Sequence, residues 1–254
     1  MIRLLDTSFP DQPGLDTAVS RAILLRGSDD DLGETLRLHV PGRVVAFGRQ
    51  DVVSPGYPAA LRATHASAFA PIERLAGGRA AVFHEGTLAF AWMIPEQDPK
   101  TTITARFERV AGLIRNVLVD LGLDARVGEV PGEYCPGSYS VNIGGRSKVM
   151  GIGQRLAKHA AHVGGVIVVH DAELVNAPLR PVYDALGLSW DPSTTGAIED
   201  SVDNISMSAV RDAFVARVMA EADLVPAVLE PETLALAREL APQHVPVGDA
   251  PAPR

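Results

Sequence analysis

The chain contains a single cysteine, Cys135, and its surroundings are typical of a nucleophile. It lies in the segment Gly-Glu-Tyr-Cys-Pro-Gly-Ser-Tyr at 132–139, thirteen residues before Lys148. A thiol attacks a carbonyl carbon as its thiolate, and a nearby cation lowers the thiol pKa from a reference of about 8.5. Lys148 is the candidate cation. The pair predicts a cysteine that carries an acyl group as a thioester, although most free cysteines are small buried apolar residues.

The residues after Cys135 predict a turn. Pro136 fixes φ and has no N–H, and Gly137 accepts a positive φ, so Cys135 is expected in a loop. A hairpin with a two-residue Gly144–Gly145 turn would then pair 143 with 146 and 141 with 148. In this register Lys148 reaches Cys135 only if the loop folds back. An exposed lysine at a strand end is the alternative.

Two glycine sites complete the candidate chemistry. Gly151 and Gly153 fall on the same side of a predicted strand, which leaves either a trench for a slim acyl chain or room for a bulge or another backbone. Gly77 and Gly78 expose backbone N–H groups that can bind a carbonyl or phosphate oxygen, unless they only form a hairpin turn.

Charged and imidazole side chains near these glycines are further candidates. Arg74 and Arg79 flank the Gly77–Gly78 pair and add positive charge to it, although a glycine hairpin with two solvated arginines is the more frequent arrangement. His84 is either a base or a packed histidine. His159 and His162 have the spacing of metal ligands but no third ligand, so no metal site is predicted.

Composition restricts the class of protein. Of 254 residues 46% are hydrophobic and 21% charged, which is typical of a globular protein, and a net charge of −8 argues against bulk nucleic-acid binding. No run approaches the roughly 18 to 20 apolar residues of a membrane-spanning helix, and no signal peptide is recognisable at the N-terminus. The lone cysteine agrees with a reducing compartment, so a cytoplasmic enzyme without a membrane partner is expected.

Hydrophobic periodicity predicts an α+β fold with mixed β-sheets flanked by helices. The expected helices span 14–26, 102–122, 171–187, 207–222 and 231–240. The expected strands are a hairpin at 35–40 and 44–48, runs within 70–94, and segments near 125–130, 139–143, 146–155 and 163–169. A catalytic domain at 1–190, a helical C-terminal extension at 191–240 and a disordered tail at 241–254 are predicted.

Four ordered motifs make the chain similar to the biotin/lipoate protein ligase superfamily, and within it to the cysteine-dependent octanoyl- and lipoyl-transferases. Gly-Arg-Gln at 48–50 resembles an upstream Gly-Arg-x-Gln strand end. The segment 74–80 with His84 resembles the family's Arg-x-x-Gly-Gly-(Gly/Arg)-Ala signature and its histidine. The segment 148–154 is similar to Lys-x-x-Gly-x-(Ala/Ser)-Gln, and 134–139 looks like the nucleophile loop of the octanoyl amidotransferase branch.

The resemblance implies a function and a site. It implies an acyl tunnel near the glycines, Cys135 as nucleophile and Lys148 as the lysine of the site. Substrate contacts are expected from Arg74, Gly77, Gly78, Arg79, Ala80, His84, Gly151, Gly153 and Gln154. The expected donor is an acyl carrier protein or the glycine cleavage H protein, the acceptor is a lysine of a lipoyl domain of a 2-oxoacid dehydrogenase complex, and no cofactor is required.

Two alternatives stay open at this point. In classical single-strand octanoyltransferases the cysteine follows the lysine, whereas residues 158–164 here contain none. An ATP-dependent lipoate protein ligase would use Lys148 and the Gly77–Gly78 loop to hold an acyl-adenylate, with Cys135 incidental. Such ligases commonly have an extra C-terminal domain, while 64 residues follow residue 190 here. A non-catalytic acyl-binding paralogue is the second alternative.

Overall fold

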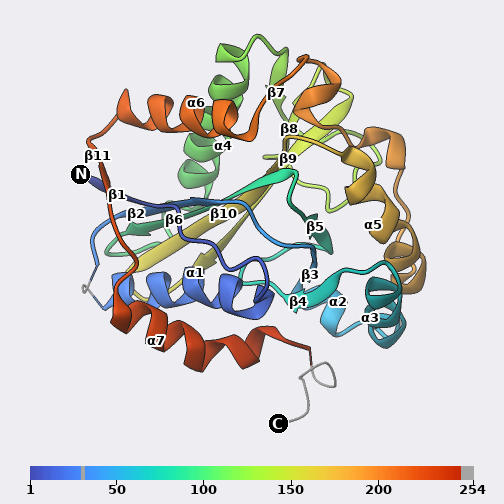
Figure 1. Cartoon of the computed structure of the whole chain (residues 1–254), viewed down its shortest axis with the longest axis horizontal. Helices are drawn as coiled ribbons and strands as arrows, with labels where there is room; N and C mark the ends of the chain where they lie inside the picture. The colour runs from blue at the N-terminus through green and yellow to red at the C-terminus, as the bar shows by residue number, and fades with distance from the viewer. Residues whose placement is uncertain (30–31, 247–254) are drawn as a thin grey trace.

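The computed structural model describes residues 1–29 and 32–246 as two β-sheets with helices packed around them (Figure 1). The large sheet has the order β11-β1-β2-β6-β10-β9-β8-β7, and the small sheet has the order β4-β3-β5. Its strands are β1 Ile2–Leu5, β2 Thr35–His39, β6 Thr87–Pro95, β7 Ala125–Val127, β8 Val141–Ile143, β9 Ser147–Leu156, β10 Ala160–Val168 and β11 Leu224–Pro226. Those of the small sheet are β3 Val44–Phe47, β4 Ala70–Glu73 and β5 Ala81–Phe83. The predicted α+β fold is confirmed.

Helices cover both faces of the large sheet (Figure 1). They are α1 Pro13–Ser28, α2 Arg49–Val52, α3 Tyr57–Ala66, α4 Ile103–Asp120, α5 Ala172–Leu186, α6 Met207–Met219 and α7 Pro231–Leu240, with 3-10 turns η1 Pro192–Thr194, η2 Ile198–Asp200 and η3 Ala241–His244. All five helices expected from periodicity occur, with ends shifted by up to three residues. None of the described helices is long and apolar enough to cross a bilayer.

The main core lies between the large sheet and the pair α4 and α6. The apolar face of α4, which includes Val110, Ile114 and Val117, is fully buried against the sheet. Phe214 of α6 packs edge-on against Phe90 of β6, with ring centroids 6.0 Å apart. On the opposite face α1 and α7 bury a second apolar cluster, and α3 and α5 pack around the small sheet.

The predicted hairpin at 35–40 and 44–48 is wrong. β2 pairs with β1 and β6 in the large sheet, whereas β3 pairs with β4 and β5 in the small one. Gly42 lacks the positive φ of a tight hairpin turn. A Cβ at Gly42 would lie 2.1 Å from the carbonyl oxygen of Pro10, so this glycine permits a close approach of another segment. The connection therefore carries the chain from one sheet to the other.

The register of the β8–β9 hairpin sets the face of β9 on which Lys148 lies. Gly144 and Gly145 adopt φ of 63° and 72°, as expected, but Ile143 pairs with Ser147 and Asn142 with Lys148, so the predicted register is wrong. The connection has three residues where two were expected. Pairing then shifts, with Val141 opposite Met150, and this bulge reverses the alternation of side chains on β9. Lys148 therefore shares a face with Gly151, whose added Cβ would lie 3.6 Å from Lys148 Cε.

The C-terminal region packs into the same core. β11 joins the large sheet beside β1, and the N–H of Gly196 donates to the carbonyl oxygen of Lys148 at 2.9 Å. η3 is ordered, because His244 is buried and its Nδ1 lies 2.7 Å from the Glu73 carbonyl oxygen. The predicted disordered tail is therefore wrong at 241–244, and its residues 247–254 lie outside the described part of the chain. The boundary at residue 190 stays a prediction.

The packing of α6 predicts one cooperative folding unit. Phe214→Ala opens a cavity in the main core, so the free energy of unfolding should fall by about 3–5 kcal/mol in a single chemical denaturation transition. Met219→Ala on the same helix is the control, because Met219 is 60% exposed and its truncation should change stability by about 0.5 kcal/mol or less. Two separate transitions would show that the segment after residue 190 folds independently.

Candidate active site

A buried carboxylate holds the loop that carries Cys135. The side chain of Glu133 is completely buried, and it accepts hydrogen bonds from the N–H of Val130 at 2.9 Å, the N–H of Gly137 at 3.2 Å and the hydroxyl of Ser140 at 2.6 Å. These donors span the loop from end to end. Glu133 therefore fixes the shape of the loop, and the sequence analysis missed this residue.

Lys148 binds the same loop through its ammonium group. Its ammonium, 1% exposed, donates to Glu133 Oε1 at 2.9 Å and to the carbonyl oxygens of Tyr134 at 2.9 Å and Cys135 at 2.8 Å. An ammonium has three protons, so these contacts use all of its donors. The loop does fold back toward Lys148, as the sequence required. The lysine binds the backbone of the loop, and no hydrogen bond joins it to the sulfur.

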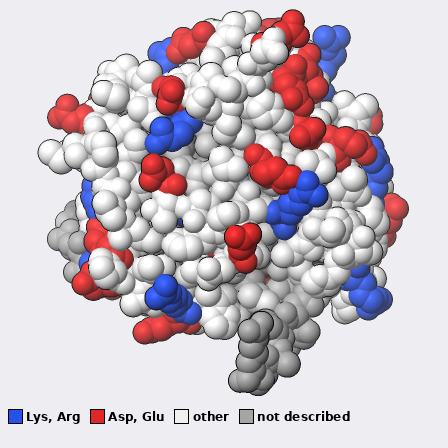
Figure 2. All heavy atoms as spheres, viewed as in Figure 1, with Lys and Arg blue, Asp and Glu red and all other residues white. Residues whose placement is uncertain are grey.

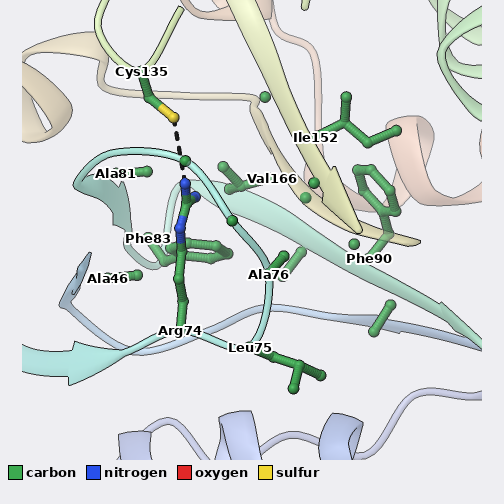
Figure 3. A pocket seen from close by; sticks show the side chains of 18 of the residues that line it. Ala46, Arg74, Leu75, Ala76, Ala81, Phe83, Phe90, Cys135, Ile152 and Val166 are labelled. Carbon is green, nitrogen blue, oxygen red and sulfur yellow. Dashed lines mark hydrogen bonds between the residues drawn. The ribbon is translucent and has the colours of Figure 1, made fainter. Parts of the chain in front are cut away.

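Arg74 is the closest cation to the thiol. Its Nη2 lies 3.4 Å from Cys135 Sγ (Figure 3). The backbone N–H of Arg79 points at the same sulfur from 3.3 Å. Burial raises the pKa of the Cys135 thiol, but the charge of Arg74, followed by that of Lys148 and the two hydrogen bonds, lowers this pKa below its ordinary value. The main thiolate-stabilising role expected of Lys148 therefore belongs to Arg74.

The backbone of Cys135 is held in an unusual conformation. Its φ of 41° lies in the left-handed region, which is uncommon for a residue with a Cβ. Its N–H donates to the Tyr183 hydroxyl at 2.9 Å, and that hydroxyl donates to the carbonyl oxygen of Ala80 at 3.0 Å. Tyr183 of α5 therefore links the nucleophile loop to the residues that precede β5. It is a second residue that the sequence analysis missed, because α5 is remote in sequence.

Gly78 lets the loop around it reach the sulfur. It has φ of 108°, and a Cβ there would lie 1.9 Å from Arg74 Nη2 and 2.9 Å from Cys135 Sγ. Gly48 is needed on the other side, because a Cβ on it would lie 1.7 Å from the carbonyl oxygen of Gly78. The Gly77–Gly78 turn thus presents the Arg79 N–H to the sulfur, where an oxyanion contact was expected.

A cavity of about 480 Å³ opens beside the sulfur, between the two sheets. Ala46, Ala81 and Phe83 of the small sheet and Val166 of the large sheet line it, and Arg74 extends along it toward Cys135 (Figure 3). Its volume lies within the range of ligand sites. Most of the residues that line it are apolar or glycine, as an acyl chain requires.

The two glycines on β9 serve different purposes. Gly151 lies beside Lys148 on the cavity wall, and its added Cβ would meet only the lysine side chain within 4 Å. Gly153 is approached by another backbone, since its added Cβ would lie 3.3 Å from the carbonyl oxygen of Gly77. The trench expected at both positions is therefore open at Gly151 and covered at Gly153.

The structure brings together most, but not all, of the predicted site residues. Cys135, Lys148, Arg74, Gly77, Gly78, Gly151, Gly153 and Gln154 line the cavity. The Gln154 amide donates to the carbonyl oxygen of Ile103 at 2.8 Å and accepts from Arg106 at 2.9 Å, which ties β9 to α4.

Three predicted substrate-binding residues, Arg79, Ala80 and His84, do not line the cavity, and their contact with a substrate stays a prediction. The Arg79 guanidinium pairs with the buried Asp51 at 3.3 Å, so only the backbone of Arg79 belongs to the site. The side chain of Ala80 is sealed in the core of the small sheet. His84 is fully buried, and its Nδ1 accepts the N–H of Gly86 at 3.0 Å. Burial lowers the pKa of His84, so the imidazole is neutral and packed.

The two histidines with ligand-like spacing lie in different surroundings. His159 is exposed with its Nδ1 3.3 Å from the carbonyl oxygen of Gln97, whereas His162 is buried. Within residues 1–29 and 32–246, no group of three His, Cys, Asp or Glu side chains could hold a metal ion.

The lipoyl protein ligase A/B catalytic domain matches residues 13–221. The chain belongs to this family. A lipoate-protein ligase A bound with ATP has the same fold, with a TM-score of 0.77 at 24% identity over 95% of this chain and 94% of that chain. A bipartite lipoate protein ligase from Thermoplasma acidophilum gives 0.72 at 23% identity, over 95% of this chain and 92% of that chain.

Curated relatives of this family member are named as transferases. An octanoyl-GcvH:protein N-octanoyltransferase of Exiguobacterium sp. is 34% identical over 161 residues, which cover 63% of this chain and 57% of the relative. One of Geobacillus kaustophilus is 28% identical, over 76% of this chain and 66% of the relative. A lipoyl-GcvH:protein N-lipoyltransferase of Listeria monocytogenes is 27% identical, over 67% and 64%. The chain thus matches less than two thirds of each relative's length.

The contacts of the sulfur predict a pH profile. Cys135 should react with iodoacetamide at a rate that rises with pH as the thiolate forms, with a midpoint below that of an ordinary thiol. Arg74→Met removes the largest stabilising charge, so this midpoint should move to higher pH, whereas Arg74→Lys should restore part of the shift. Arg43→Met is the control, because Arg43 pairs with the exposed Glu85. An unchanged midpoint in Arg74→Met would remove Arg74 from the account.

The buried ion pair predicts a stability change. Lys148→Met leaves the buried Glu133 carboxylate without its cation, and the free energy of unfolding should fall by about 3–5 kcal/mol. Adding Glu133→Gln removes the unpaired charge and should recover part of this loss, as measured by chemical denaturation. Equal stability of Lys148→Met and the wild type would contradict the pairing.

Proposed function

We propose that this chain is an acyltransferase that moves an octanoyl or lipoyl group through a thioester on Cys135 to a lysine of a lipoyl domain. The observation that carries the proposal is the position of the sulfur. It lies at the cavity wall, with Arg74 and the Arg79 N–H directed at it and an apolar chamber beside it. This arrangement favours a thiolate and gives a fatty chain a place to bind.

The proposed reaction has two half-reactions. The thiolate attacks the acyl carbonyl carbon of the donor; the new C–S bond forms as the bond from that carbon to the donor breaks, and the departing amine or thiolate of the donor takes up a proton. The ε-amine of the acceptor lysine then attacks the thioester, forms an amide and loses a proton, while the C–S bond breaks and restores the thiolate. No cofactor enters this balance.

We place the glycine cleavage H protein first as the donor and an acyl carrier protein second. The names of the relatives support this order, because those proteins are named for transfer from GcvH. The acceptor is a lipoyl domain of a 2-oxoacid dehydrogenase complex; the T. acidophilum structure was reported with an E2 lipoyl domain. We also propose that the chain works in the cytoplasm, because its nucleophile must remain a free thiol.

An ATP-dependent lipoate protein ligase is the second candidate, favoured by the fold shared with a ligase bound to ATP. The geometry of this site supports it less. All three Nζ protons of Lys148 are used within the nucleophile loop, and the Arg79 N–H is directed at the sulfur. These are groups that an acyl-adenylate would need. A non-catalytic acyl-binding protein would not need a thiol with a lowered pKa.

Intact mass spectrometry tests the transferase. After mixing with octanoylated glycine cleavage H protein, the chain should gain the mass of one octanoyl group, which hydroxylamine removes because the bond is a thioester. Cys135→Ser should not give the hydroxylamine-labile adduct. Ser138→Ala provides the control in the same loop and should still be acylated.

Two other results would decide for the alternatives. Release of pyrophosphate from ATP in the presence of lipoate, retained in Cys135→Ala, would identify a ligase. Absence of any adduct with both octanoylated carriers, and of pyrophosphate release, would leave an acyl-binding protein.

A further inference from the structure

The cavity has a polar wall that the proposed chemistry at Cys135 does not use. Asp16 and Ser20 of α1, His39 of β2 and His162 of β10 all line it. Asp16 is paired with the buried Arg37, and His39 Nε2 lies 3.3 Å from Asp16 Oδ2. Of this group, His39 Nδ1 is buried without a hydrogen-bond partner among the described residues. His162 stands apart from this network.

His162 is a buried imidazole in the wall of the cavity. The residue is 6% exposed, and its ring forms no hydrogen bond or ion pair with any side chain or backbone group that the structure describes. A Cβ added to Gly164 would lie 2.4 Å from His162 Nε2, so the nitrogen edge of the ring covers Gly164, which also lines the cavity. The missing side chain at Gly164 makes room for this imidazole.

The imidazole is neutral. Burial and the nearby charge of Arg37 lower the pKa of His162 to about 4. At neutral pH one ring nitrogen therefore carries a proton and the other is an acceptor. A bound group can accept a hydrogen bond from the ring or donate one to it.

The imidazole lies beyond the reacting end of the cavity. A Cβ added to Gly78 would lie 2.9 Å from the sulfur, and one added to Gly153 of β9 would lie 3.3 Å from the carbonyl oxygen of Gly77. Gly164 lies opposite Gly153 in the register of β9 and β10. One strand spacing, about 4.8 Å, separates Gly164 from Gly153. An acyl chain that starts at Cys135 therefore meets His162 with its distal carbons and not with its carbonyl.

The chemistry of that distal end then matters. A chain that ends in methylene and methyl groups displaces water from the imidazole and offers its nitrogens no partner. A chain with a heteroatom there gives the ring N–H an acceptor, and a sulfur atom is a weak one. Leaving a buried polar group without a partner corresponds to about tenfold or more in affinity.

We propose that His162 is a specificity-determining residue that favours acyl chains with a heteroatom near the distal end, and that among eight-carbon groups it favours lipoyl, with its two sulfurs, over octanoyl. The proposal rests on the acyl transfer proposed above. The nucleophile loop cannot distinguish lipoyl from octanoyl, because the two acyl groups are identical at the carbonyl. The discrimination must therefore come from the cavity.

A competition experiment tests this preference. Equal amounts of octanoylated and lipoylated glycine cleavage H protein are mixed with the chain, and the two Cys135 adducts are quantified by intact mass. His162→Phe keeps a ring but removes both nitrogens, so the ratio of lipoyl to octanoyl adduct should fall about tenfold. His162→Gln, which retains a donor and an acceptor, should preserve part of the wild-type ratio. His159→Leu is the matched control on the same hairpin and should leave the ratio unchanged.

Binding separates this proposal from the proposed function. If the wild type forms neither adduct, the transfer fails, and calorimetric titration with free lipoate and octanoate tests His162 alone; the ratio of the two affinities should then fall about tenfold in His162→Phe. If His162→Phe does not fold, His162→Leu replaces it. A folded variant that lacks both nitrogens and keeps the wild-type ratio overturns the proposal, and would indicate that water satisfies the imidazole.

Discussion

The nucleophile loop depends on one buried ion pair, Glu133 with Lys148. The carboxylate accepts hydrogen bonds from both ends of the loop, and the ammonium donates to two carbonyl oxygens at its centre. Burying two charges is expensive unless every donor and acceptor is used, and here all three donors of the ammonium have partners. The hydrogen bonds of the pair thus offset the free-energy cost of burying its charges and fix the conformation of the loop, including the left-handed φ of Cys135.

The site divides two tasks between two cations. Lys148 holds the backbone of the loop, and Arg74 reaches along the cavity to the sulfur. The bulge in β9 makes the first task possible, because regular alternation would turn Lys148 away from Gly151 and the cavity. Gly48 and Gly78 make the second possible, because side chains at these positions would occupy the space of the Gly78 carbonyl and of the Arg74 guanidinium. Acidic and basic side chains are interspersed over the face of the molecule that Figure 2 shows.

Periodicity and motifs predicted the helices, the α+β class and the cluster of residues around Cys135. They failed where contacts between distant segments decide. β2 and β3 lie in different sheets, and Pro10 approaches Gly42 closely in the segment between them. The face of β9 on which Lys148 lies is set by a bulge. The alternation of apolar and polar residues reveals neither feature. Glu133 could have been predicted from the sequence, since a carboxylate two residues before a candidate nucleophile in a Pro-Gly loop indicates a site residue. Tyr183 could not, because nothing local in α5 points to a loop almost fifty residues earlier.

The division of tasks can be measured by hydrogen exchange of the amides in the segment 130–140, compared among the wild type, Lys148→Met and Arg74→Met. The account predicts faster exchange across this segment in Lys148→Met, because the loop loses the group that fixes its carbonyl oxygens, and wild-type protection in Arg74→Met. Wild-type protection in Lys148→Met, or loss of protection in Arg74→Met alone, would contradict it.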